Sequence, residues 1–90
     1  MIVLQPIYTN SFAKDIKLAQ KRGKNIEKLK KIVELLVNKE PIPPKFRDHN
    51  LVGDFIGRRE CHIEPDWLLI YKIDKDEIIF ERTGTHSDLF

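Results

Sequence analysis

The sequence predicts an α+β protein: an antiparallel β-sheet covered on one face by an N-terminal hairpin of two helices, with elements in the order β-α-α-β-β-β. Three observations predict this arrangement: a strand-like N-terminal segment, two segments of helical period behind it, and three short apolar runs separated by tight turns. Consecutive strands joined by short turns form an antiparallel meander, and a helical hairpin can cover one of its faces. Because 90 residues are too few for two ordinary domains, we expect residues 1–90 to form a single domain.

The first forty residues predict one strand and two helices. Residues 2–8 are rich in β-branched and aromatic side chains, and Pro6 indicates an edge strand or a bulge because proline lacks a backbone N–H. Apolar side chains at helical spacing mark the two helices, in residues 12–19 and 26–36. Typical boundary residues stand at their ends: the capping segment Thr9-Asn10-Ser11, a left-handed cap at Gly23, a second N-cap at Asn25, and Pro41 beyond the second helix.

The second half of the chain predicts a loop and three strands. Residues 41–50 show no periodicity and contain three prolines, so we expect an ordered loop that holds His49. The expected strands are residues 58–64, 67–73 and 77–83, with turns at Pro65-Asp66 and at residues 74–76.

Three histidines, His49, His62 and His86, lie in this half of the chain together with Asp66 and Arg82. Imidazole is the side chain whose unperturbed pKa lies near neutrality, so histidines beside a carboxylate and a guanidinium can move protons and stabilise a developing anion. In a meander His62 and Asp66 bracket one turn, while the chain after Arg82 can turn so that His86 folds back toward the sheet. One histidine at a strand end is more often a surface residue, but three favour a site. Strand alternation puts His62 on the polar side of its strand, with Arg58, Glu60 and Glu64.

The net charge of +2 is unevenly spread, because residues 11–40 are rich in lysine and arginine whereas residues 66–90 are acidic. A basic helical face attracts a phosphate polymer, although a plain solvated helix has the same composition. The candidate contacts on the first helix are Lys14, Lys17, Lys21 and Arg22. Trp67 is more typical of a core residue than of a base-stacking platform, and Phe90 fits the core and a ligand surface equally well.

Other chemistries are less favoured. Cys61 is the single cysteine, so it forms no internal disulfide, and it is more typical of an inert core residue than of a nucleophile. The sequence lacks HExxH, paired CxxC and two histidines one helical turn apart, and Arg82 would repel a cation, so we expect neither a metal site nor a cofactor. It also lacks a leader-like segment or a long apolar run, so we expect a cytoplasmic protein without membrane contact.

The chain resembles the YafQ-like branch of the RelE/ParE superfamily, the toxins of bacterial type II toxin-antitoxin pairs. The resemblance runs nearly end to end and is most specific in the histidine-containing motifs. It covers residues 14–22, Asp48-His49, residues 61–72, residues 80–86 and Leu89-Phe90.

This resemblance implies a microbial-ribonuclease-like fold and metal-independent cleavage of messenger RNA on the translating ribosome. It implies neutralisation by a cognate, DinJ-like antitoxin, with operator DNA contacted only through the antitoxin complex. It also implies an active surface made of His49, His62, Asp66, Arg82, His86 and Phe90.

RNA carries its own nucleophile, so a base for the 2′-OH, a cation for the charged phosphorane and an acid for the leaving 5′-oxygen suffice. Our hypothesis makes His86 the main proton-transfer residue, most simply the acid. His62 or His49, with Asp66, supplies or orients the base, and Arg82 contacts the scissile phosphate. The acid and base roles are interchangeable at this stage. Two alternatives remain open: a non-catalytic nucleic-acid-binding module and a ParE-like inhibitor of DNA gyrase.

Overall fold

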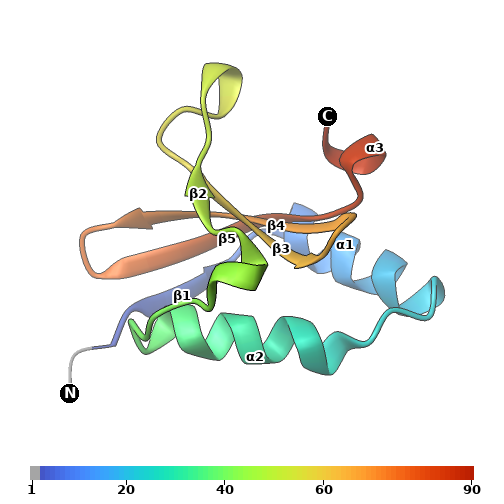
Figure 1. Ribbon diagram of the computed structural model, residues 1–90, viewed down its shortest axis with the longest axis horizontal. Helices are drawn as coiled ribbons and strands as arrows, with labels where there is room; N and C mark the ends of the chain where they lie inside the picture. The colour runs from blue at the N-terminus through green and yellow to red at the C-terminus, as the bar shows by residue number, and fades with distance from the viewer. Residues whose placement is uncertain (1–2) are drawn as a thin grey trace.

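The structure, a computed structural model, describes residues 3–90 apart from the side chain of Asp54. Its centre is a five-stranded sheet in the order β1-β5-β4-β3-β2, with two long helices on one face (Figure 1). The strands are β1 (Gln5–Tyr8), β2 (His49–Asn50), β3 (Arg59–Glu64), β4 (Trp67–Asp74) and β5 (Glu77–Gly84). The helices are α1 (Asn10–Lys21), α2 (Ile26–Val37) and α3 (His86–Leu89), with short 3-10 turns η1 (Pro44–Phe46) and η2 (Gly53–Phe55).

The helix boundaries follow the sequence signals. The Thr9 hydroxyl accepts a hydrogen bond from the Phe12 amide at 3.0 Å and caps α1, while Asn25 accepts from the Glu27 amide at 3.1 Å and caps α2. Gly23 between them has a φ of 76°, a left-handed conformation that suits glycine. These local features confirm the predicted hairpin. Of the predicted first strand, Ile2 lies outside the described residues.

The predicted antiparallel sheet is wrong at one edge: the sheet is mixed. The three strands β3, β4 and β5 form the expected antiparallel meander, but β1 lies parallel to β5, with Gln5 opposite Glu77 and Tyr8 opposite Phe80. The direction of β1 relative to β5 depends on how the helix hairpin packs on the sheet. The residue pattern within a strand does not determine that packing. The position of β1 at the sheet edge confirms the indication given by Pro6.

Two short elements were not predicted as such. The end of the proline-rich loop pairs with β3 as the two-residue strand β2, and the segment after β5 forms α3. In Figure 1 the β2–β3 connection and α3 both rise from the sheet on the side away from α1 and α2. The face opposite the helices therefore lies between these two projections.

The core fills both faces of the sheet. The larger part lies between the sheet and the helices and includes Phe12, Leu29, Ile32, Trp67 and Phe80. The smaller part lies on the opposite face, where Leu89 of α3 packs with Leu68 and Ile70. In the described part of the chain, no helix has both the length and the apolar character needed to cross a membrane.

Candidate active site

Alternation along β3 sends Cys61 and Ile63 into the core under the helices and leaves Glu60 and His62 on the opposite face. Glu60 is nevertheless buried, and the nearest Glu60 carboxylate oxygen lies 3.1 Å from His62 Nε2. The pairing of β2 with β3 puts His49 directly opposite Glu60, with His49 Nε2 3.6 Å from the same oxygen. A buried carboxylate thus stands between two imidazoles.

Arg59 fixes the position of His49 through both of its neighbours in the chain. Its guanidinium donates to the Asp48 carboxylate at 3.0 Å and to the Asn50 side-chain oxygen at 2.7 Å. The Tyr71 hydroxyl donates to Asp48 as well, and burial together with this bond raises the pKa of Tyr71 well above its usual range. His49 is exposed, but the backbone that carries it is held by charge-assisted hydrogen bonds.

The third histidine comes from α3. Thr85 and Asp88 form a capping box, in which each side chain accepts a hydrogen bond from the backbone amide of the other. Asp88 also pairs with Arg22, the C-cap residue of α1, at 2.6 Å, and this pair with the capping bonds holds the pKa of Asp88 well below its usual range. The short helix is thereby tied to α1 and places His86 over the sheet.

Asp66, in the β3–β4 turn, is the carboxylate partner of His86. Its Oδ1 accepts from the His86 backbone amide at 2.9 Å and lies 2.6 Å from His86 Nδ1. These two bonds lower the pKa of Asp66, so its carboxylate is ionised at neutral pH. We expected Asp66 to serve His62 or His49, but the structure pairs Asp66 with His86 and gives the other two histidines Glu60.

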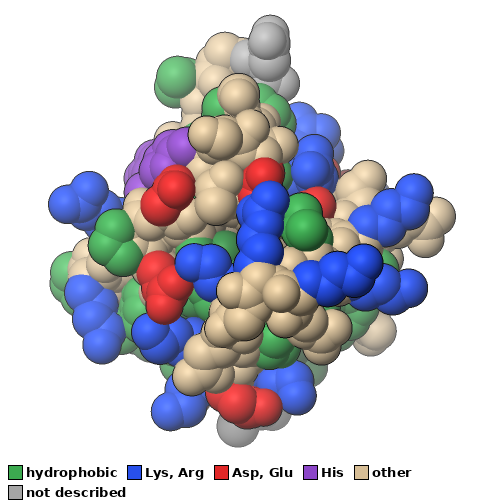
Figure 2. All heavy atoms as spheres, turned by 90° about the vertical axis from the view of Figure 1, so that its right-hand side faces the viewer, with side chains coloured by type: hydrophobic (Ala, Val, Ile, Leu, Met, Phe, Trp, Pro, Cys, Tyr) green, Lys and Arg blue, Asp and Glu red, His purple; other side chains and the backbone are tan. Residues whose placement is uncertain are grey.

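The three imidazoles stand in a row, which we call the histidine row: His49, His62 and His86. The ring centroids of His49 and His62 are 5.9 Å apart, and those of His62 and His86 are also 5.9 Å apart. Figure 2 shows the histidine side chains gathered in one patch of the surface, with acidic groups beside it. The three histidines therefore lie together, as the strand order led us to expect.

Arg82 lies on β5 and is paired with Ile70 of β4. On its other side, Ile70 is paired with Glu60 of β3. Its guanidinium donates to Asp15 of α1 through Nε at 2.7 Å and Nη2 at 3.2 Å, and this partner raises the pKa of Arg82. Asp15 also accepts from the Thr83 amide at 3.1 Å. The arginine is a permanent cation whose direction Asp15 sets.

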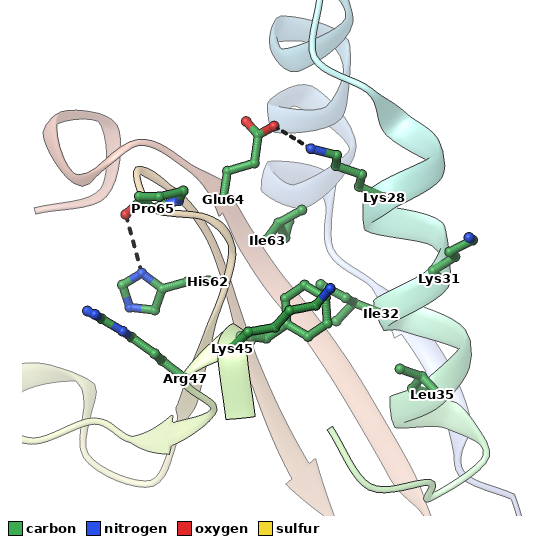
Figure 3. Close-up of a pocket in the computed structure, with 11 residues that line it drawn as sticks. Lys28, Lys31, Ile32, Leu35, Lys45, Arg47, His62, Ile63, Glu64 and Pro65 are labelled. Atoms are coloured by element: carbon green, nitrogen blue, oxygen red, sulfur yellow. Dashed lines mark hydrogen bonds and ion pairs between the residues drawn. The ribbon is translucent and has the colours of Figure 1, made fainter. Parts of the chain in front are cut away.

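A cleft of about 560 Å³ adjoins His62, between α2 and the segment from η1 to β3. Figure 3 shows its apolar floor, including Ile32 and Ile63, beneath a rim of lysine and arginine side chains. The cations that line it are Lys28, Lys31, Lys45 and Arg47. None of these four was among the candidates named from the sequence, because only the folded chain brings η1 beside α2.

The predicted nucleic-acid contacts fall into three groups. Phe90 is 60% exposed and packs edge-on against Phe55, with ring centroids 5.1 Å apart, so its other face is open to a ligand. Trp67 is fully buried and donates through Nε1 to Thr83 at 3.0 Å, so it belongs to the core and offers no stacking surface. The basic residues of α1 and its C-cap are all exposed, but they lie in the helix layer, and the C-cap residue Arg22 is engaged by Asp88. They are Lys14, Lys17, Lys21 and Arg22.

Cys61 does not belong to this chemistry. Its side chain is fully buried in the core under the helices, and burial raises the pKa of its thiol to about 12. A nucleophilic or metal-binding cysteine acts as the thiolate, which this environment suppresses.

Sequence reasoning left two carboxylates out of the candidate set. Glu60 carried a signal, since it lies two residues before His62 and therefore on the same strand face. Asp15 carried none, because its contacts to Arg82 and Thr83 join α1 to β5. Three potential metal ligands, His49, Glu60 and His62, also have donor atoms within 4.8 Å of one another. The pairing of β2 with β3 creates this cluster, which no spacing in the sequence reveals.

The arrangement suits proton transfer at an anionic substrate. Three imidazoles stand side by side, Glu60 faces two of them, and Asp66 faces the third. A fixed arginine and a basic cleft supply positive charge. Such a surface on this small mixed sheet is what the resemblance to the toxins of bacterial type II toxin-antitoxin systems implied. A model of the YafQ toxins of these systems matches residues 4–90, and the chain belongs to that family.

Known relatives agree with this placement. The mRNA interferase toxin YafQ of Escherichia coli K12 is 50% identical over 84 residues, which cover 92% of this chain and 91% of that protein. A chain in the crystal structure of the E. coli DinJ-YafQ toxin-antitoxin complex gives a TM-score of 0.91 at 48% identity, covering 99% of both chains. A metal-bound toxin from Helicobacter pylori gives a TM-score of 0.91 at 39% identity, covering 97% of this chain and 99% of that one.

Proposed function

We propose that this chain is the endoribonuclease toxin of a type II pair: it cleaves messenger RNA on the translating ribosome in the cytoplasm, without a metal cofactor, and a cognate DinJ-like antitoxin neutralises it. The histidine row with its two carboxylate partners carries the proposal, because it supplies an acid and a base side by side. The E. coli relative is named an mRNA interferase, and the related E. coli toxin forms a complex with DinJ.

The acid in this proposal is His86. Its Nδ1 faces the ionised Asp66, which orients the ring and leaves Nε2 for the substrate. Such a ring can deliver a proton to the leaving 5′-oxygen. Because α3 holds His86 at the surface, more than half exposed, a ribosome-bound message can reach it.

The base is on the other part of the row. His62, only 13% exposed, has its Nε2 against the Glu60 carboxylate and His49 as its neighbour. A buried carboxylate stabilises the imidazolium that forms when the ring takes the proton of the 2′-OH. Glu60 thus takes the place that we first gave to Asp66.

Arg82 and Phe90 complete the substrate contacts in this proposal. The guanidinium of Arg82, aimed by Asp15, stabilises the charge that develops on the scissile phosphate, so its loss lowers the rate more than the affinity. The open face of Phe90 stacks on a base next to the cleavage point. The cations of the cleft beside His62 hold flanking phosphates, while the basic face of α1 serves the ribosome or the antitoxin.

The test is cleavage of a translated message, with ends mapped by primer extension, by the wild-type protein and by His86→Ala. We expect His86→Ala to lower the cleavage rate by about 10²- to 10⁴-fold, the usual contribution of an acid-base residue. Its melting temperature should match that of the wild type because the side chain is exposed and outside the core. A chelator selective for transition metals, which spares ribosomal Mg²⁺, should leave wild-type cleavage unchanged.

Full activity of His86→Ala would contradict the assignment. RNA binding without cleavage by the wild-type protein would support the nucleic-acid-binding alternative. Inhibition of DNA supercoiling in a gyrase assay would support the ParE-like alternative.

A further inference from the structure

The two imidazoles beside Glu60 are oriented by backbone carbonyl groups. His49 Nδ1 lies 2.6 Å from the Arg47 carbonyl oxygen, and His62 Nδ1 lies 3.4 Å from the Pro65 carbonyl oxygen. A carbonyl accepts, so Nδ1 carries the hydrogen in each ring. In a neutral imidazole the other nitrogen, Nε2, then bears a lone pair.

Both of these Nε2 atoms face the same carboxylate oxygen of Glu60, at 3.6 Å for His49 and 3.1 Å for His62. With neutral rings, three lone-pair-bearing atoms would confront one another around a buried carboxylate, which is unfavourable. A shared cation removes the conflict: either a proton on a ring or a metal ion among the three atoms. Histidine ligands of metals commonly donate their second N–H to a backbone carbonyl or a carboxylate, as both rings do here.

The spacing of the three atoms fits a tetrahedral ion. Bonds of about 2.1 Å to nitrogen and oxygen put neighbouring ligand atoms about 3.4 Å apart. The measured separations of 3.1 and 3.6 Å from Glu60 lie on either side of that value, and all three ligand atoms are within 4.8 Å. The side chain of His49 is 49% exposed, so its ring can rotate to close the remaining gap.

We propose that His49, Glu60 and His62 form a binding site for a divalent ion of the late first-row transition metals, and that an ion held there stops RNA cleavage. Two imidazoles and one carboxylate suit Zn²⁺ and Cu²⁺, with Cu²⁺ bound more tightly. Mg²⁺, which prefers oxygen ligands, should bind far more weakly. The inhibitory part rests on the proposed function: the ion occupies the ring nitrogens that would otherwise take the proton of the 2′-OH.

Neighbouring charges affect how tightly this site binds a cation. Arg82, which we expected to repel a cation, is paired with Asp15 on α1. One opposing charge is that of Arg47, which lines the same cleft as His62 and lies beside its ring in Figure 3. Removal of the Arg47 guanidinium should therefore strengthen metal binding while its backbone carbonyl continues to orient His49.

Binding is tested by calorimetric titration of the whole protein with Cu²⁺, Zn²⁺ and Mg²⁺ salts. We expect one ion per chain in the order Cu²⁺, Zn²⁺, Mg²⁺, and at least about tenfold weaker Zn²⁺ binding by Glu60→Gln and His49→Gln. His86→Gln is the matched control, because its ring lies outside the cluster, and it should bind like the wild type. Arg47→Gln should bind more tightly, a gain that no loss of folding can produce.

Several results would overturn the site: no Zn²⁺ or Cu²⁺ binding by the wild type, unchanged affinity in both cluster variants, or an equal loss in His86→Gln. His49→Gln guards against misfolding, since His49 is exposed and its replacement leaves the core intact. In electron paramagnetic resonance, Cu²⁺ on the wild type should show two nitrogen ligands, and Cu²⁺ on His49→Gln should show one.

Inhibition is tested separately on protein loaded with one equivalent of Zn²⁺ and freed of excess ion by gel filtration. The loaded wild type should cleave at least about tenfold more slowly than the metal-free protein, and a transition-metal chelator should restore its rate. Glu60→Gln treated in the same way should keep the rate of its own untreated sample. Loaded protein that cleaves at full rate, or faster, would overturn the inhibition, whereas a metal-free protein that never cleaves would contradict the proposed function and leave the binding result standing.

Discussion

The two parts of the histidine row are held by different means. His62 and Glu60 lie on β3, an interior strand paired on both sides, and His62 is 13% exposed. His86 lies on the four-residue helix α3, is 55% exposed, and depends on a capping box and one ion pair. The sheet thus fixes the buried residues that we propose as the base, whereas a few hydrogen bonds at the surface fix the proposed acid. Substitutions on β3 should change the chemistry and leave the fold intact. Substitutions around α3 should make the position of His86 less well defined.

Among the groups that support the histidines, the largest effect should come from Glu60→Gln on the sheet side. The shape is kept but the negative charge that stabilises a protonated His62 is lost, so we expect cleavage to fall by about 10²-fold. Glutamine keeps the shape of the side chain and can still exchange hydrogen bonds with the imidazoles, so the melting temperature should change little. Single-turnover cleavage and thermal melting measure the two outcomes.

The control for this variant is Glu77→Gln, an exposed glutamate on β5. It removes the same charge without touching the histidine row and should leave the rate unchanged. A Glu60→Gln protein that cleaves normally would show that the buried carboxylate is not needed for the base.

Asp88→Asn tests the surface part of the histidine row, where α3 holds His86. It weakens the cap of α3, which costs about 1 kcal/mol in helix stability and should lower cleavage about fivefold, and it also removes the charge that pairs with Arg22. Hydrogen exchange of the α3 amides should increase while that of β3 does not. Arg22→Gln, which keeps the capping box, should have a smaller effect.

If Arg22→Gln lowers cleavage more than Asp88→Asn, Arg22 contacts RNA or the ribosome directly. That result would restore the role predicted for it from the sequence. It would also contradict the interpretation that Arg22 acts mainly by holding α3 in place through Asp88.

Asp15→Asn tests the link between α1 and β5 and should act more weakly. The amide can still accept one hydrogen bond from Arg82 but carries no charge, so the guanidinium is less firmly aimed. For a partly exposed pair we expect about a threefold loss of rate, equivalent to about 0.6 kcal/mol. The loss should appear in kcat rather than in KM, and an effect confined to KM would contradict the aiming role.

The smallest effect is expected from pH. The native pKa of Asp88 lies below that of an unfolded aspartate, near 3.9, so its stabilising contribution is complete above that pH and is lost progressively as the pH falls below it. The melting temperature of the wild type should therefore approach that of Asp88→Asn in acid. A constant difference between the two proteins from pH 6 to pH 2 would show that Asp88 does not titrate with folding.

Local features of the fold were predictable from the sequence, and long-range ones were not. The caps formed by Thr9, Asn25 and Gly23 involve only residues close to them in the chain, so these capping roles can be recognised from the local sequence alone. The same kind of signal was present but unused in Thr85 and Asp88, whose spacing is that of a capping box. The parallel pairing of β1 had no such signal, because tertiary packing decides it.

The site divides in the same way. The three histidines were identified by residue type, and the strand order made their approach reasonable. Their carboxylate partners were not assigned correctly, because a turn that brings His62 near Asp66 in the sequence says nothing about α3. The cluster of potential metal ligands was missed for a related reason: it depends on the register that puts His49 opposite Glu60.

The tethers between α1 and the C-terminal segment also have a consequence for the order of folding. Arg22 and Asp88 are 66 residues apart in the chain, and Asp15 and Arg82 are 67 apart. Contacts of such large sequence separation carry a loop-closure cost and tend to form late, after local hairpins and helices. A partly folded chain can thus hold His62 on the β3–β4 hairpin while α3 is still unanchored. Catalytic competence should therefore appear only with the last long-range contacts, and not with the local hairpin and helices.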